Sequence, residues 1–335
     1  MNPIKSTLLL VVSFVSIQAF GQYTEVINSN RPGVSRSAFS VGTNVLQFEA
    51  GPYIINEERT PALKTEVSGF GVDFAVRYGL LWEPLELNIE GNYQNDTKTY
   101  FSNIPFDEDR ANFKFVTIGA KYLVYDPYKN AEEDKPNLYS WKANHRFKWK
   151  YLIPAVSVYL GANYDTKNNP YTAPGIEGFS PKVMIASQNN FSGGWVFVIN
   201  LIKDRIGTDQ SDFSYILTLT HSFSPQWVVF GEAQGIKSDF YADNLFRVGA
   251  AYLLSKDFQL DAGLTFNTKD TPAVFSANFG LSYRLDFHED KEVKDDKSPE
   301  AVMEKAERKS KKRKSSDDVQ IDSRPKRKSI DFDDN

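Results

Sequence analysis

Hydrophobic and polar residues alternate with a period of two between residues 258 and 287. Phe258, Leu260 and Leu264 in the first half, and Phe279 and Leu281 in the second, stand between polar or small residues. Such alternation predicts two β-strands, each with one apolar and one polar face, joined by a turn at 269–272. Strands of about ten residues match a tilted span of a bilayer. The stretch therefore predicts a transmembrane hairpin with its apolar face towards lipid and its polar face towards a lumen.

The same alternation recurs along the chain. Strands are expected at residues 46–51, 66–78, 85–93, 112–125, 153–164, 179–189, 195–202, 213–223, 227–235, 245–254, 258–267 and 275–287. Short connections are expected at 81–84, 191–194, 224–226 and 255–257, and longer ones at 95–110, 165–178, 202–211 and 236–244. Short periplasmic turns and longer outer loops are typical of outer-membrane barrels, although residues 126–150 and 269–272 fit this rule poorly. We predict an all-β fold, a transmembrane antiparallel β-barrel of about twelve strands.

The N-terminal residues follow the sequence of regions found in a secretory signal peptide. Lys5 precedes an apolar run at residues 8–15, and small residues follow near residue 21. The run is too short to span a bilayer as a helix, so a signal peptide is favoured over a membrane anchor. The expected location is the outer membrane of a Gram-negative bacterium. An even number of strands then places both termini in the periplasm.

The expected organisation has four parts: a signal peptide at 1–21, a periplasmic N-terminal segment or plug at 22–42, the barrel at 43–287 and a tail at 288–335. In the tail, charged residues dominate and apolar residues nearly vanish, so it cannot bury enough surface to fold alone. We expect a disordered periplasmic tail that either is simply solvated or contacts the cell wall or a periplasmic protein. Its basic runs resemble nucleic-acid patches, but export argues against a nucleic-acid partner.

The composition excludes several kinds of chemistry. The chain has 335 residues, a net charge of -4 at pH 7 and no cysteine, which excludes disulfides and thiolate sites. No phosphate loop, dinucleotide fingerprint or paired-histidine zinc motif is present, so we expect no enzyme activity, no cofactor and no metal. His221 and Ser222 are adjacent and invite a hydrolase pair, but neighbouring residues of a strand point to opposite faces, which argues against it.

The polar faces of the predicted strands supply the residues expected to line the lumen. The candidates are Glu49, Asp73, Arg77, Glu86, Asn88, Glu90, Glu232, Arg247, Asp261 and Arg284. Two interpretations remain open at this stage. In one, the carboxylates line an aqueous path and, facing the arginines, set its selectivity. In the other, the charges pair with one another and fill a barrel whose strand number lies between filled and open barrels.

The opening of the mature chain carries a family resemblance. Arg31 and Pro32 follow the signal peptide, and Gln47, Glu49 and Gly51 form a Gln-x-Glu-x-Gly strand. This order resembles a family of bacterial outer-membrane proteins labelled with the MetA-pathway of phenol degradation. Members of that family often have Asp on both sides of the Arg-Pro pair, where this chain has Asn30 and Gly33. The resemblance implies uptake of small solutes, aromatic compounds among them.

Two functions from different classes are consistent with these patterns. The first is an outer-membrane channel or transporter for passive uptake of small solutes, including aromatic or hydrophobic ones, with membrane lipid and the solute as its partners. The second is a structural or docking barrel with a closed lumen, whose tail binds a periplasmic partner or the cell wall. A soluble β-sandwich is the alternative fold, but outward rows of Phe, Leu and Val would be costly in water.

Overall fold

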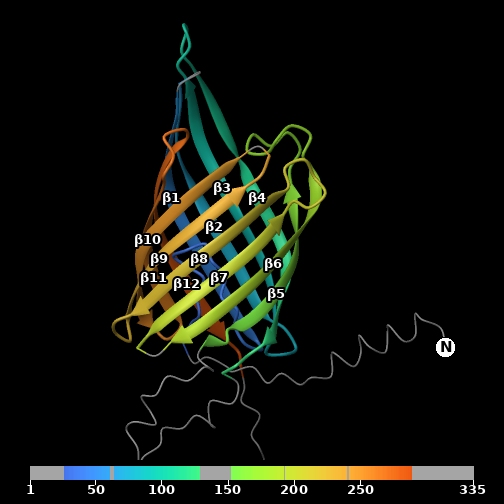
Figure 1. Cartoon of the computed structure of the whole chain (residues 1–335), viewed down its shortest axis with the longest axis vertical. Coiled ribbons are helices and arrows are strands. Elements are labelled where there is room, and N and C mark those ends of the chain that lie inside the picture. Colours follow the sequence, from blue (N-terminus) through green and yellow to red (C-terminus); the bar gives the residue numbers. More distant parts are fainter. Residues whose placement is uncertain (1–25, 61–63, 129–151, 192, 240, 289–335) are drawn as a thin grey trace, which may run out of the picture. The chain divides into compact units, whose positions relative to one another are not determined.

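The computed structural model describes residues 26–60, 64–128, 152–191, 193–239 and 241–288. In this part of the chain, twelve antiparallel strands form a closed barrel, which confirms the predicted fold class (Figure 1). The strands are β1 (Val45–Arg59), β2 (Thr65–Gly79), β3 (Leu85–Tyr100), β4 (Phe106–Tyr125), β5 (Ala155–Asp165), β6 (Gly178–Phe191), β7 (Trp195–Asp204), β8 (Asp212–Ser222), β9 (Trp227–Lys237), β10 (Ala242–Ser255), β11 (Phe258–Asn267) and β12 (Ala273–Asp286). The predicted signal peptide, most of the connection 126–150 and nearly all of the tail lie outside the described residues.

Each strand pairs with its neighbours in sequence, and β1 pairs with β12 to close the barrel. The closing register places Leu46 opposite Leu285 and Glu49 opposite Ser282. Closure leaves no sheet edge unpaired within the bilayer, where an unpaired backbone group has no water to bind. Among the described residues, no helix is long and apolar enough to cross a membrane, a finding that concerns helices and not strands.

The outer surface of the barrel carries the apolar residues of the alternating pattern. Ile118 on β4 is 56% exposed, and Phe279 on β12 is 55% exposed. Polar neighbours such as Thr117 and Ser282 are fully buried inside. An apolar outer face of this size is stable against lipid and costly in water, so the barrel is built to span a membrane.

Aromatic residues gather at the barrel end where β1 begins. Trp195 is exposed on the outer surface, and its ring stacks on His221 with centroids 4.1 Å apart. Ser222 instead lines a cavity inside the barrel. His221 and Ser222 therefore lie on opposite faces of β8, as expected for adjacent residues of a strand.

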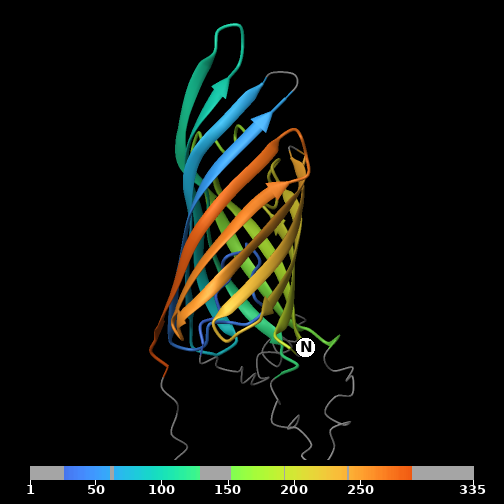
Figure 2. The same ribbon diagram turned by 90° about the vertical axis from the view of Figure 1, so that its left-hand side faces the viewer.

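The predicted loop at 95–110 is wrong, because β3 and β4 continue through most of it. The strands pair as far as Tyr100 and Phe106, and the connection is confined to residues 101–105. Figure 2 shows this hairpin rising beyond the neighbouring strands. Its polar side chains bond across the strands, as Thr97 Oγ1 does to Asp109 at 2.8 Å. Both faces of this extension are polar, so no apolar face was available to reveal the strands in the sequence.

Candidate functional site: a segment bound inside the barrel

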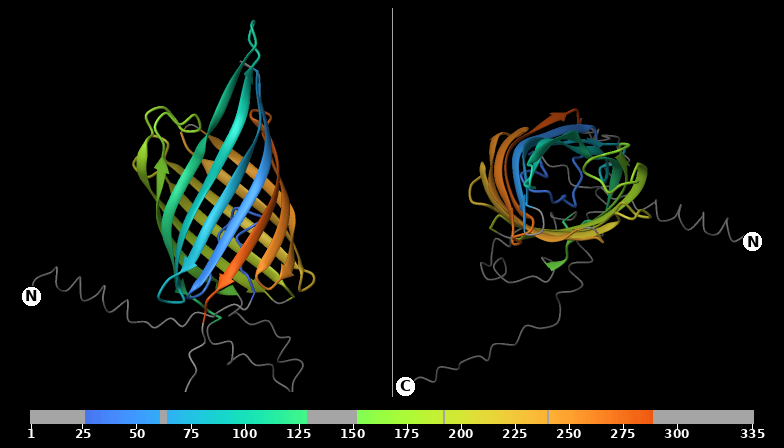
Figure 3. Two further views of the ribbon diagram at one scale, coloured as in Figure 1. Left: turned by 180° about the vertical axis from the view of Figure 1, so that it is seen from behind. Right: turned by 90° about the horizontal axis from the view of Figure 1, so that it is seen from above.

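The residues before β1 run inside the barrel rather than away from it (Figure 3). Their backbone groups bond to side chains of the barrel wall. The N–H of Asn30 donates to Glu49 at 3.2 Å, and the N–H of Val41 donates to Glu86 at 3.1 Å. The carbonyl of Ser37 accepts from the ammonium of Lys121 at 3.0 Å. An irregular segment leaves its backbone polar groups unpaired, and the polar lumen provides the missing partners. We refer to residues 26–44 as the luminal segment.

Arg31 is bound in a niche between β1, β11 and β12. Its Nη2 lies 3.1 Å from Asp261 Oδ1, and its Nε lies 3.3 Å from Asp261 Oδ2. Gly51 and Gly280 form the walls of the niche, because a Cβ atom at either position would overlap the guanidinium. The Arg31 carbonyl also accepts from Gln259 at 3.2 Å. A bidentate pair with this geometry fixes both position and orientation of the arginine.

The Gln-x-Glu-x-Gly residues of β1 contact the luminal segment. Gln47, Glu49 and Gly51 share the inner face of the strand because they are two residues apart. Gln47 donates from Nε2 to the carbonyl of Asn28 at 3.2 Å, and Glu49 accepts from the N–H of Asn30. Gly51 leaves room for Arg31. The three residues thus form one contact surface for the start of the luminal segment.

Glu232 on β9 binds the turn that follows Pro32. Its carboxylate accepts the N–H groups of Val34 and Ser35 at 3.1 to 3.2 Å. It also accepts from Thr218 Oγ1 at 2.8 Å and pairs with Arg247 at 3.0 Å. Gly33 lies directly against this carboxylate, where a Cβ atom would come within 2.5 Å of Oε2. One buried side chain therefore holds two consecutive backbone donors of the luminal segment.

Arg36 connects the luminal segment to the opposite side of the barrel. Its guanidinium pairs with Glu90, which also pairs with Lys182 at 3.0 Å. The Arg36 carbonyl accepts from Asn200 Nδ2 at 2.9 Å. Burial alone would lower the pKa of Arg36, but the Glu90 and Glu49 carboxylates together outweigh it and raise the pKa above its usual range. The arginine therefore remains charged at any physiological pH.

A second charge cluster lies beside the segment on β1 to β4. Arg77 bonds to Glu86 through Nε and Nη2, both at 2.9 Å, and to Glu49 at 3.2 Å. Lys121 pairs with Glu86 at 3.3 Å. All four side chains are at most 2% exposed. Charges buried this deeply need mutual pairing to offset their desolvation.

The structure brings most of the predicted lumen residues to the segment or its cavities. Glu49, Arg77, Glu86, Glu90, Glu232 and Asp261 contact the luminal segment directly, and Asp73, Asn88 and Arg247 line the cavity beside it. Arg284 instead binds Asp257 at 2.8 Å at the end of the barrel and lines neither of the cavities described below. Sequence reasoning did not select Arg36, Lys182, Asn200 or Gln188, which accepts from Ser37 Oγ at 2.8 Å. The available signal for Lys182, Gln188 and Asn200 was their position on the inner faces of strands, whereas Arg36 belongs to no strand and offered none.

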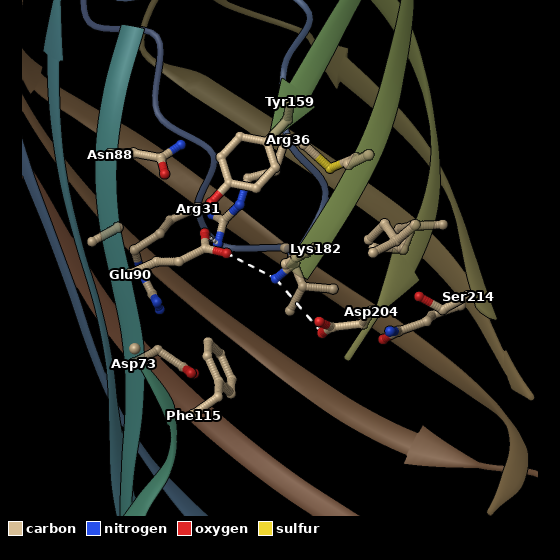
Figure 4. Close-up of a pocket in the computed structure, with 18 of the residues that line it drawn as sticks. Arg31, Arg36, Asp73, Asn88, Glu90, Phe115, Tyr159, Lys182, Asp204 and Ser214 are labelled. Atoms are coloured by element: carbon tan, nitrogen blue, oxygen red, sulfur yellow. Dashed lines mark hydrogen bonds and ion pairs between the residues drawn. The ribbon is translucent and has the colours of Figure 1, made fainter. Parts of the chain in front are cut away.

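Two cavities lie on either side of the luminal segment. The outer cavity has a volume of about 380 Å³ and lies towards the longer loops, beside Asp204 and Asp212 (Figure 4). The inner cavity has a volume of about 270 Å³ and lies towards the short turns, beside Ser222. Arg31, Pro32 and Gly33 line both. The Arg-Pro-Gly stretch therefore lies between the two cavities.

The chain belongs to the family described as "Putative MetA-pathway of phenol degradation", which it matches over residues 29–285. Among solved structures it is similar to the COG4313 outer membrane channel from Pseudomonas putida F1, with 10% identity, a TM-score of 0.48, and coverage of 77% of this chain and 100% of that one. It is also similar to the KdgM porin, with 8% identity, a TM-score of 0.42, and coverage of 70% and 99%. No curated protein matches the chain.

Proposed function

We propose that this protein is an outer-membrane channel for passive uptake of small solutes, and that the luminal segment holds it closed at rest. The observation that carries the proposal is the partition at Arg31, Pro32 and Gly33, with a cavity on each side. The segment is bound by hydrogen bonds and ion pairs and is not a strand of the barrel. Its departure would therefore join the two cavities and leave the wall intact.

The strength of these contacts sets how often the channel opens. Three charge-assisted contacts hold the partition: Arg31 with Asp261, Arg36 with Glu90, and Glu232 with two backbone N–H groups. Hydrogen bonds to charged groups contribute about 1.5 to 3 kcal/mol each. Each such contact that must break on opening lowers the open fraction about tenfold or more. A channel of this kind conducts rarely until a signal or a solute displaces the segment.

A closed docking barrel is the second candidate, and the pairing of the luminal charges favours it. Glu86, Glu90, Glu232 and Asp261 all have cationic partners within 3.3 Å. In that case the barrel is a membrane anchor and the tail at 288–335 is the working part. The two candidates differ in whether removal of the luminal segment creates a conducting path.

Single-channel recording in planar bilayers tests the proposal. The full-length protein should be nearly silent, and a variant without residues 22–42 should give discrete, long-lived conductance steps. Glu232→Gln should raise the frequency of brief openings about tenfold or more, because a neutral amide binds the two N–H groups more weakly. Glu177→Gln, an exposed loop carboxylate, is the matched control and should match the full-length protein.

Deletion of the tail at 288–335 separates the two candidates. The proposed channel keeps its conductance steps when this deletion is combined with loss of residues 22–42. A docking barrel stays silent in every variant and loses a periplasmic partner when the tail is removed. Silence of the variant without residues 22–42, with a folded barrel shown by β-sheet circular dichroism, would refute the channel proposal.

A further inference from the structure

The wall of the outer cavity formed by β6 to β10 is partly apolar, although the same strands also place polar side chains such as Lys182, Asp204 and Gln234 in it. Five consecutive strands, β6 to β10, each place an aliphatic side chain in this wall. These are Met184, Ile202, Ile216, Ile236 and Leu245. Ile216 is only 2% exposed. A wall of this kind binds water poorly and would gain free energy by covering apolar surface of a ligand.

The opposite wall of the cavity carries most of its charged groups, including Asp73 and Lys114, beside aromatic residues such as Phe115. Lys114 enters the cavity because of a β-bulge. In the pairing of β3 with β4, Asn92 lies opposite Phe115 and Tyr93 lies opposite Phe113, so Lys114 is the extra residue. Lys114 and its neighbour Phe115 both line the cavity, although adjacent residues of a regular strand face opposite ways. Bulges frequently redirect a side chain at functional sites.

Lys114 and Asp73 both line the outer cavity but are not bonded to each other. The other charged groups around the Lys114 ammonium are Glu57, Asp96 and Arg110. Glu57 is bound to Arg59 at 2.7 Å, and Asp96 is bound to Arg110 at 2.6 Å. Among the described residues, neither the Lys114 ammonium nor the Asp73 carboxylate has an ion-pair partner within 4.0 Å.

The carboxylate of Asp73 can also accept further hydrogen bonds. Its Oδ1 accepts from Asn92 Nδ2 at 2.6 Å, and among the described residues its Oδ2 has no protein donor. Lys114 has three N–H donors and no protein acceptor in the same part of the chain. The two residues therefore present an unused acceptor and unused donors, separated by a gap, across the cavity from the apolar wall.

We infer that the outer cavity binds small neutral molecules with an apolar body and one hydroxyl group. The hydroxyl donates to Asp73 and accepts from Lys114, and the apolar body lies against Ile202, Ile216 and Ile236. A volume of about 380 Å³ is at the small end of the range for ligand pockets. As a statement about the transported solute, this inference rests on the channel function proposed above; binding itself is independent of transport.

The charges of the cavity favour a hydroxyl over an ionised head group. A carboxylate would gain from Lys114 but would lie beside Asp73, and an ammonium would gain from Asp73 but lie beside Lys114. The remaining charges at the cavity do not break this symmetry. Besides Lys114 and Asp73, the described residues of the lining hold five basic and five acidic side chains, so neither sign of charge is in excess. Lys182 is paired with Glu90 and lies 3.9 Å from Asp204, and Lys121 is paired with Glu86. A hydroxyl is both donor and acceptor and uses both groups without adding a charge.

Four ring compounds of nearly equal size test the inference: cyclohexanol, cyclohexanecarboxylate, cyclohexylamine and methylcyclohexane. Binding to the closed full-length protein is measured by isothermal titration calorimetry in matched detergent at neutral pH. Cyclohexanol should bind most tightly, about tenfold tighter than either charged analogue. Lys114→Met and Asp73→Asn should each weaken cyclohexanol binding about tenfold. Lys203→Met removes an exposed lysine of β7 that does not line the cavity, and should leave binding unchanged.

Several results would overturn the inference. Preference for the carboxylate or the amine would show that one charge dominates the site. Binding of methylcyclohexane as tight as that of cyclohexanol would show that Asp73 and Lys114 do not contribute to binding. Absence of binding by all four compounds would show that the cavity is not a site. The comparison of ligands uses the native chain, so it remains decisive if a variant fails to fold. Conductance of the variant without residues 22–42 reports on the channel separately, so the two proposals fail independently.

Discussion

The guanidinium of Arg31 is bound by the carboxylate of Asp261 through two hydrogen bonds of 3.1 and 3.3 Å, across 230 residues of sequence. The contact joins the luminal segment to β11, on the far side of the closing seam between β1 and β12. Gly51 and Gly280 make it sterically feasible. The arrangement ties an arginine of the luminal segment to β11, next to the seam where β1 and β12 close the barrel.

Gly51→Ala should loosen the luminal segment without unfolding the barrel. The added methyl overlaps the Arg31 guanidinium, so the arginine must leave Asp261 or distort its niche. Overpacking of this kind costs about 1 to 3 kcal/mol. Openings in planar bilayers should become at least about fivefold more frequent. At Gly231, which faces outward, a Cβ atom meets nothing within 4 Å, so Gly231→Ala is the control. Equal opening rates for the two variants would contradict the role of Arg31.

Glu86→Gln should destabilise the barrel strongly. Glu86 accepts two bonds from Arg77 and pairs with Lys121, and removal of its charge leaves Lys121 without an ion-pair partner among the described residues. Breaking such a buried pair costs about 3 to 5 kcal/mol. Urea unfolding of the protein in lipid vesicles measures the change. Glu66→Gln affects only a solvent-exposed pair with Lys64 and should leave the transition midpoint where it is. A similar shift of the transition midpoint in both variants would show that the buried cluster contributes no more to stability than a surface ion pair.

Leu217→Arg should lower the stability of the barrel in lipid. Leu217 lies at the middle of β8 on the outer face. An arginine on the lipid face costs about 2 to 4 kcal/mol at the bilayer midplane. Heat-modified migration in gel electrophoresis, followed against temperature, reports the loss. Asp209→Arg introduces the same residue in an exposed loop, and this variant should unfold at the same temperature as the unmutated protein. A stable Leu217→Arg barrel would mean that this face does not contact lipid.

Tyr171 attaches the loop between β5 and β6 to the wall of the barrel. Its hydroxyl lies 3.0 Å from Asp96 Oδ2 and within 3.2 Å of the carbonyls of Gln94 and Arg110. Tyr171→Phe should speed amide exchange in residues 166–177 about tenfold, which corresponds to about 1.4 kcal/mol. Among the described residues the hydroxyl of Tyr164 has no hydrogen-bond partner, so Tyr164→Phe is the control. Unchanged exchange in Tyr171→Phe would show that the loop is held by other contacts.

The same contact predicts how the loop responds to pH. Burial and the Asp96 carboxylate raise the pKa of the Tyr171 hydroxyl above its usual range. A group whose pKa is raised in the bound state stabilises that state fully below its ordinary value, about 10 for tyrosine. Exchange in residues 166–177, corrected for intrinsic rates, should stay constant through neutral pH and rise only under strongly alkaline conditions. A transition near neutral pH would contradict this assignment.

The sequence by itself determined the barrel and the direction of most of its side chains. A period of two is local, and it follows from strand geometry which of Glu86 and Leu87 faces the lumen. Strand number and the apolar outer face were predictable for the same reason. The alternation was lost where both faces are polar, so the β3–β4 extension was missed.

Only the tertiary structure decided which inner residues meet. Arg31 with Asp261 and Arg36 with Glu90 depend on how twelve strands close and on the path of the luminal segment through the lumen. The bulge at Lys114 depends on the pairing of β3 with β4 and breaks the local period. Alternation fixes the face on which a side chain lies. Its partner depends on contacts between distant parts of the chain, which form only when the barrel closes.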